Sequence, residues 1–246
     1  MHSTVNGLVL REVNYRDSDK MLTILTEHGK ISAVSRGART QKSVLRAGTQ
    51  LLSYSEFTLF ESNSRFSVDK ADIKELFIGI RNDIEKLALG SYFAELLDIL
   101  SDEDAPSPGL LKTGLNCIYA LSQNKKPDIF IKSVFEFRCA IIAGYSPALS
   151  ACAVCGAEHP EAPALGVITG QLVCLHCSPH PATLSQISPG VLTALKYLLF
   201  CDDKKILSFS LSADDLLLMS RLTEQYLLGK LERKIHTLDF YKSLYT

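Results

Sequence analysis

The sequence predicts an α+β multidomain fold, in which a five-stranded β-barrel precedes an α-helical domain that carries a four-cysteine zinc module. Residues 1–78 contain five short segments rich in strand-forming residues, some of them with polar and apolar residues alternating. Such strands favour a small barrel, because closure removes exposed edges. From residue 79 onward, apolar residues recur every three or four positions, as in amphipathic helices. We therefore place one domain at 1–78 and the next at 79–246.

The strands of the first domain are bounded by turn residues. Glu27, His28 and Gly29 separate the second strand from the third, and residues 62–64 separate the fourth from the fifth. The expected strands are residues 4–10, 20–26, 30–35, 55–61 and 65–69.

Helices are expected throughout the second domain, except where cysteine, proline and glycine gather at about 146–184. Pro127 suits the first turn of a helix, and Ser212 suits an N-cap. An acidic loop that contains two prolines follows the first helix. The expected helices are residues 80–100, 108–123, 128–143, a helix from 188 onward, and a long one from 212 to about 232.

Four cysteines predict a metal site in the segment 146–184. Cys152 and Cys155 form one C-x2-C pair, Cys174 and Cys177 form a second, and 18 residues separate the pairs. Two such pairs are typical of a tetrahedral four-sulfur Zn²⁺ site, which is closed to water and therefore structural. Residues 166–173 in the gap fit a short hairpin. The sequence therefore predicts one structural Zn²⁺.

Two other interpretations of these cysteines stay open, although we favour zinc. Disulfides belong mainly to secreted proteins, and nothing else in the sequence indicates secretion. A redox C-x2-C motif would be expected between a strand and a helix of a βαβ unit. Cys117, Cys139 and Cys201 lie in apolar helical stretches and are interpreted as small core residues.

Composition and charge narrow the class of protein. With 46% hydrophobic and 22% charged residues, the chain is globular and not disordered. We expect no signal peptide and no membrane span, and hence a cytoplasmic protein. The net charge of −1 conceals a cluster, because residues 28–50 contain five basic residues and no acidic one. Such a cluster favours a partner of opposite charge.

The basic residues of this cluster continue from the third expected strand into a loop. We call residues 35–46 the basic loop; its cations are Arg36, Arg39, Lys42 and Arg46. Cations on a loop suit the phosphate backbone of a nucleic acid, although a solvated surface is the alternative. Small barrels often bind single strands, whose bases stack on aromatic rings. The candidate rings are Tyr15, Tyr54, Phe57 and Phe66, of which Phe57 and Phe66 are the better candidates for core.

Sequence motifs of catalysis are absent. The chain lacks the phosphate-binding, dinucleotide-binding, zinc-protease and nucleophile-elbow patterns. Asp17 and Asp19 have the spacing of a shared metal site, but a solvated turn beside Arg16 and Lys20 is the simpler interpretation. We therefore expect a protein that is not an enzyme.

Several short motifs, in the same order along the chain, resemble the RecO family of bacterial recombination proteins. They extend over nearly the whole sequence and include the first cysteine pair. They are YRDSDK at 15–20, LTEHGK at 25–30, RGAR at 36–39, FEFR at 135–138, GYSPAL at 144–149, CAVCG at 152–156, LERK at 231–234 and LDF at 238–240.

The resemblance implies an oligonucleotide-binding (OB) fold barrel joined to a helical domain with a zinc module. It implies a DNA repair and recombination mediator in the bacterial cytoplasm, associated with the nucleoid. Such a protein binds single- and double-stranded DNA and anneals complementary strands. It contacts the acidic C-terminal tail of single-stranded-DNA-binding protein, works with RecR and helps load RecA. The DNA-contact candidates that follow from it are Arg11, Arg16, Lys20, Lys30, Arg36, Arg39, Lys42 and Arg46.

For the acidic tail, the resemblance points to the helical domain, where Lys132 and Arg138 are the candidates. Two other classes of function stay open from the residues alone. An RNA-binding barrel with a zinc ribbon would recognise the 2′-OH. A metal-dependent hydrolase would need a zinc ion with an open position, which four cysteines do not leave.

Overall fold

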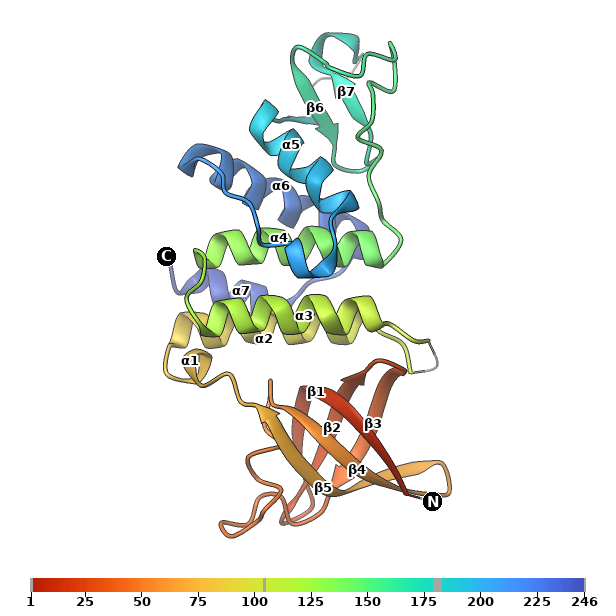
Figure 1. Ribbon diagram of the computed structural model, residues 1–246, viewed down its shortest axis with the longest axis vertical. Coiled ribbons are helices and arrows are strands. Elements are labelled where there is room, and N and C mark those ends of the chain that lie inside the picture. Colours follow the sequence, from red (N-terminus) through yellow and green to blue (C-terminus); the bar gives the residue numbers. More distant parts are fainter. Residues whose placement is uncertain (1, 104, 179–182, 246) are drawn as a thin grey trace. The chain divides into compact units, whose positions relative to one another are not determined.

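A computed structural model describes residues 2–103, 105–178 and 183–245 of the chain (Figure 1). Packing divides it into two compact units. One unit is Met1–Gln123 together with Ile235–Thr246, and the other is Asn124–Lys234. No helix in the described part of the chain has the length and apolar character needed to cross a membrane.

The first unit begins with a closed five-stranded barrel (Figure 1). The strands close in the order β1-β2-β3-β5-β4, and β3 runs parallel to β5, with Ala33 opposite Phe66. All other neighbours are antiparallel. This order is that of an OB barrel, as expected. The strands are β1 (His2–Tyr15), β2 (Asp19–Thr26), β3 (Gly29–Ser35), β4 (Tyr54–Ser62) and β5 (Arg65–Glu75).

Inward-pointing apolar side chains, which alternate along the strands with outward-pointing ones, fill the barrel. In β4, Phe57 and Leu59 are buried, whereas Glu56 and Thr58 are half-buried and Phe60 is exposed, because successive side chains point to opposite faces. Ile24 from β2 and Val9 from β1 join them in one apolar cluster. The five predicted strands are confirmed, and all five are longer than expected, β1 and β5 by the most.

Helices complete the first unit. They are α1 (Ile78–Arg81), α2 (Ile84–Leu100), α3 (Pro108–Ser122) and α7 (His236–Ser243). Asp83 caps α2 by accepting from the backbone N–H groups of residues 85 and 86. A Cβ on Gly79 would lie 2.0 Å from the carbonyl oxygen of Ser122, so only glycine allows this approach of α1 to the end of α3. The barrel and these helices pack as one unit, since α2 contacts both β1 and β2.

Helix α7 is a short element that the sequence analysis does not predict. It packs on α2, where the Glu95 carboxylate accepts hydrogen bonds from the backbone N–H of Thr237 at 3.0 Å and from the hydroxyl of Thr237. The hydroxyl of Tyr245 donates to Glu85 at 3.0 Å. The end of the chain therefore belongs to the packing of the first unit.

The described residues of the second unit form three α-helices and a small sheet. The helices are α4 (Asp128–Ile142), α5 (Pro189–Phe200) and α6 (Ala213–Leu231). The sheet has the order β7-β6-β8, with β6 at Pro163–Gly166, β7 at Leu172–Cys174 and β8 at Leu184–Gln186. The expected hairpin is present as β6 and β7, whose turn includes Gly170 with a positive φ of 72°.

A buried ion cluster joins α4 to α6. Lys132 lies 2.7 Å from a carboxylate oxygen of Glu136 and 2.8 Å from one of Glu224. Burial alone would lower the pKa of Lys132, but the two carboxylates outweigh burial and raise it. Glu136 also accepts a hydrogen bond from the hydroxyl of Thr223 at 2.9 Å. The cluster is thus held by several bonds, as a buried charge requires.

Candidate metal centre and nucleic-acid interface

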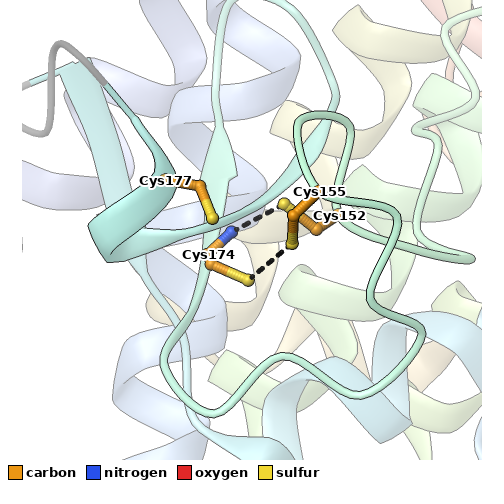
Figure 2. A group of neighbouring side chains, drawn as sticks. All are labelled: Cys152, Cys155, Cys174 and Cys177. Carbon is orange, nitrogen blue, oxygen red and sulfur yellow. Dashed lines mark hydrogen bonds between the residues drawn. The ribbon is translucent and has the colours of Figure 1, made fainter.

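The four predicted cysteines come together in the second unit (Figure 2). All four sulfur atoms lie within 4.8 Å of one another. Cys152 and Cys174 are buried, Cys177 is half-buried and Cys155 is exposed. Among the described residues, no histidine or carboxylate joins the group, and its four donors are sulfurs.

Local backbone structure brings these four sulfur atoms close together. Gly156 has a φ of 75° and its N–H donates to the carbonyl oxygen of Cys152 at 2.9 Å, which closes the loop after the first pair. Cys174 ends β7, and a 3₁₀ turn at Leu175–Cys177 returns the second sulfur of that pair. The backbone N–H of Cys174 donates to the sulfur of Cys152 at 3.2 Å and links the two pairs (Figure 2).

Three of the thiols, those of Cys152, Cys174 and Cys177, have shifted pKa values. Backbone N–H groups, first those at Cys155 and then Cys174, lower the pKa of Cys152 to about 6. Burial is the first cause that raises the pKa of Cys174 to about 12, and burial likewise raises the pKa of Cys177. Neighbouring sulfurs resist joint ionisation, so a bound cation is what would stabilise four thiolates here.

The spacing of the sulfurs suits a tetrahedral ion, because one sulfur–sulfur distance has the ideal value and none exceeds 4.8 Å. Sulfurs placed about 2.3 Å from a central ion would be about 3.8 Å apart. The sulfurs of Cys155 and Cys174 are 3.8 Å apart. The group can therefore hold a metal ion with soft, sulfur-preferring character, and it leaves no ligand position for water.

Six of the eight predicted DNA-contact residues lie at the surface of the barrel unit. They are exposed and belong to β1, the turn after it and the basic loop. The six are Arg11, Arg16, Arg36, Arg39, Lys42 and Arg46.

The basic loop is fastened to the turn between β1 and β2. The buried carboxylate of Asp19 accepts from the backbone N–H of Gly37 at 2.8 Å. The backbone N–H of Arg39 donates to the carbonyl oxygen of Ser18 at 2.9 Å. Asp19 is thus a positioning residue, and its interpretation as part of a solvated turn is wrong because it satisfies the loop backbone.

Lys20 and Lys30 are half-buried and already paired. Lys20 bonds the carboxylate of Glu12. Lys30 donates to both a carboxylate oxygen and the carbonyl oxygen of Asp98, each at 2.8 Å, and so joins β3 to α2. A phosphate would have to compete with these carboxylates for either lysine.

The candidate stacking rings divide between surface and core. Tyr15 is exposed, and the guanidinium of Arg16 lies 5.1 Å from its ring centroid. Tyr54 is half-buried, and burial is the main cause that raises its pKa. Phe57 is fully buried in the barrel, and Phe66 packs against the same cluster. Of the four rings, Tyr15 is therefore the one placed among the exposed cations.

Comparison with known proteins identifies both parts of the chain. Residues 1–77 match the family model for the N-terminal part of recombination protein O, and residues 81–239 match that for its C-terminal part. The chain belongs to the RecO family. It is 36% identical to the DNA repair protein RecO of Acetivibrio thermocellus over 97% of this chain and 96% of that protein. It is 31% identical to the RecO protein of Symbiobacterium thermophilum over 98% and 96% of the two chains.

Two residues that the RecO resemblance suggests for the acidic tail lie inside the second unit. The side chain of Lys132 is 4% exposed and sits in the ion cluster with Glu136 and Glu224. The side chain of Arg138 is 10% exposed, pairs with Asp203 and donates to the carbonyl oxygen of Leu198 at 2.8 Å. An acidic partner would have to displace internal carboxylates to reach either cation.

The sequence pattern of α4 already indicates that Lys132 and Arg138 are buried. Helix α4 is apolar on nearly all sides between Phe130 and Ala140, and such a helix lies in a core. Lys132 and Glu136 have the i, i+4 spacing of an ion pair. Charges on a buried helix must find partners, so the pattern favours an internal cluster.

Proposed function

We propose that the chain is a DNA repair and homologous recombination mediator that binds single- and double-stranded DNA through the barrel unit. It anneals complementary strands coated with single-stranded-DNA-binding protein, and with RecR it helps load RecA. It acts in the bacterial cytoplasm, at the nucleoid, and no catalytic step is part of this function. The observation that carries the proposal is an anchored basic loop on an OB barrel in a RecO-family chain.

The DNA contacts that we propose are the six exposed cations, with Arg36 and Arg39 at the centre of the basic loop. Cations that neutralise phosphates release condensed counterions, which favours binding without regard to base sequence. Lys20 and Lys30 contribute less, because internal carboxylates already hold them. Tyr15 offers a ring on which a base can stack.

The positive charge of these cations also accounts for strand annealing. Two complementary strands repel each other, and a basic surface that binds both lowers this repulsion. Contact with the acidic tail of the coating protein would raise the local concentration of the mediator at exposed single strands. Base pairing then supplies the free energy, so no nucleotide is consumed.

The four cysteines have a structural role in this proposal. We assign one Zn²⁺ to them, because four sulfurs at these distances suit a closed tetrahedral site. Zinc supplies folding free energy to such modules, on the order of 10 kcal/mol in isolated ones. Cys152 and Cys174 would hold the ion from the buried side, and Cys155 from the exposed side.

The test is annealing of two complementary DNA strands, each precoated with single-stranded-DNA-binding protein, without nucleotide. We expect the protein to accelerate annealing, and deletion of the acidic tail from the coating protein to abolish the acceleration. No acceleration by folded, zinc-loaded protein would contradict the proposal. A preference for RNA over DNA of the same sequence in competition would instead support an RNA-binding barrel.

A further inference from the structure

An open polar hollow of about 430 Å³ lies beside the basic loop in the first unit. Its lining brings together residues from three separate parts of the chain: β1 and β2, the segment from the basic loop to residue 50, and α1. Four of its lining side chains are cations and one is a carboxylate. The cations are Lys20, Arg39, Arg46 and Arg81, the carboxylate is Glu12, and Gln50 adds an uncharged amide.

The one carboxylate of the hollow is already engaged. One oxygen of Glu12 pairs with Lys20, and the other accepts from the backbone N–H of Leu51 at 3.0 Å. Glu12 therefore offsets Lys20 and leaves the charge of three guanidinium groups without a matching carboxylate in the lining. An anion is the ligand that this excess of positive charge favours.

Two of the guanidinium groups are held in place by the barrel unit. Arg81 donates through Nε to the carbonyl oxygen of Leu76 at 3.1 Å, and through Nη2 to that of Leu51 at 2.8 Å. Arg39 donates through Nη1 to the carbonyl oxygens of Arg16 and Asp17 at 3.3 and 3.2 Å. Both side chains use only some of their N–H donors on backbone oxygens, so other donors can bind an oxyanion. A guanidinium that is already held in place loses little conformational freedom when it does so.

The chemistry of the lining selects a phosphate over a base. None of the described residues that line the hollow is aromatic, so these residues offer no ring on which a base could stack. Arginine forks match the oxygens of a phosphate in pairs, whereas Gln50 can donate one further hydrogen bond. Such a site would recognise the backbone of a strand and be indifferent to its sequence.

We propose that this hollow is a phosphate subsite for one backbone phosphodiester of a bound strand, with Arg46 as its exposed contact and Arg39 and Arg81 as its fixed ones. The inference rests on the proposed DNA binding and adds two residues to it: Arg81, which lies outside the basic cluster at 28–50, and Gln50, an uncharged residue at the end of that cluster. Strands of any sequence would pass from the basic loop toward α1.

The test is the affinity of the full chain for a fluorescent thymidine oligonucleotide, measured by anisotropy over a range of salt concentrations. Gln50→Glu places a negative charge in the hollow and changes no hydrogen bond that holds the fold, since the side chain of Gln50 only lines the hollow. Arg46→Ala removes the exposed cation. The control is Gln225→Glu, which makes the same charge change at an exposed position of α6.

We expect Arg46→Ala to make the plot of log affinity against log salt shallower by about 0.7, and to weaken binding on the order of five-fold near 0.1 M salt. Gln50→Glu should weaken binding at least as much, and Gln225→Glu should bind like the wild type. The double variant Arg46→Ala/Gln50→Glu should lose less binding free energy than the two single variants lose together, because both changes act on one phosphate.

Two results would overturn the subsite, and they are distinguishable. If Arg36→Ala/Lys42→Ala, which removes two exposed loop cations that do not line the hollow, weakens binding while folded Arg46→Ala and Gln50→Glu bind like the wild type, the hollow holds no phosphate and the proposed DNA binding stands. If the wild type itself does not bind the oligonucleotide, both proposals fail together.

Discussion

The buried carboxylate of Asp19 accepts a hydrogen bond from the backbone N–H of Gly37, with an oxygen–nitrogen distance of 2.8 Å. This contact joins the start of β2 to a loop 18 residues further along the chain. With the bond from Arg39 to the carbonyl oxygen of Ser18, it holds the cations of the basic loop against the barrel. The loop therefore presents its charge from a defined position.

Replacing Asp19 with alanine should loosen the basic loop without removing a cation. A hydrogen bond to a charged group contributes about 1.5–3 kcal/mol, so the variant should melt at a lower temperature. Trypsin cleaves after arginine and lysine, and a looser loop can more readily adopt the extended conformation that the protease needs at its four such residues. Trypsin should therefore cut the variant faster than the wild type between residues 36 and 46, as followed by mass spectrometry.

Asp17→Ala is the matched control for this prediction, because Asp17 is exposed and gives only its backbone oxygen to Arg39. It should be cut like the wild type. Equal cutting of Asp19→Ala and Asp17→Ala would show that the carboxylate of Asp19 does not hold the loop.

Lys30→Ala should affect stability more than DNA binding. The ammonium of Lys30 joins β3 to α2 through Asp98, and both side chains are mostly shielded from water. We expect a loss on the order of 1 kcal/mol in the free energy of unfolding, and the same loss for Asp98→Ala. Urea denaturation of the two single variants and the double variant measures the pair. A clearly lower salt dependence of DNA binding in Lys30→Ala would instead place this lysine on the strand.

Cys155→Ser should lower the metal content and the melting temperature of the protein. One ligand of the four-sulfur group would be lost, and the remaining three leave the ion more weakly held. Zinc per chain, measured by inductively coupled plasma mass spectrometry, should fall well below one. Cys201→Ser is the control, because Cys201 lies outside the sulfur group. Full zinc and an unchanged melting temperature in Cys155→Ser would contradict the structural role of this cysteine.

Lys132→Ala should destabilise the second unit strongly. It leaves Glu136, which is 0% exposed, without its ammonium partner. Removing one member of a buried ion pair costs about 3–5 kcal/mol. Lys112→Ala, at an exposed position of α3, is the control and should change the free energy of unfolding little. Equal unfolding midpoints for the two variants in urea would mean that the cluster does not hold α4 to α6.

Sequence pattern was sufficient for much of this fold because the deciding forces are local. Alternation and turn residues located the five strands, and the spacing of the cysteine pairs identified the sulfur group that the structure assembles. Ser212 was expected to cap a helix, and its hydroxyl accepts from the backbone N–H of Asp215. The signals for the strands and the cap lie within a few residues of the element, and each cysteine pair is itself a local motif.

Other features depend on residues that meet only in the fold. The contact between Asp19 and Gly37 requires the closed barrel, and no local pattern around Asp19 distinguishes it from Asp17. Helix α7 has eight residues and is fixed mainly by its contacts with α2, including Glu95. Arg81 reaches the hollow only because α1 follows β5 closely. The roles of such residues can be identified only in the folded structure, where distant segments of the chain come together.

Salt dependence of binding to a single-stranded oligonucleotide shows whether the basic loop binds the DNA backbone. Arg36→Ala/Arg39→Ala should weaken binding for all sequences and make the log–log slope shallower by about 1.4, or about 0.7 for each lost phosphate contact. Lys204→Ala/Lys205→Ala removes the same charge from exposed positions in the second unit and should keep the wild-type slope. An unchanged slope in folded Arg36→Ala/Arg39→Ala would contradict the account.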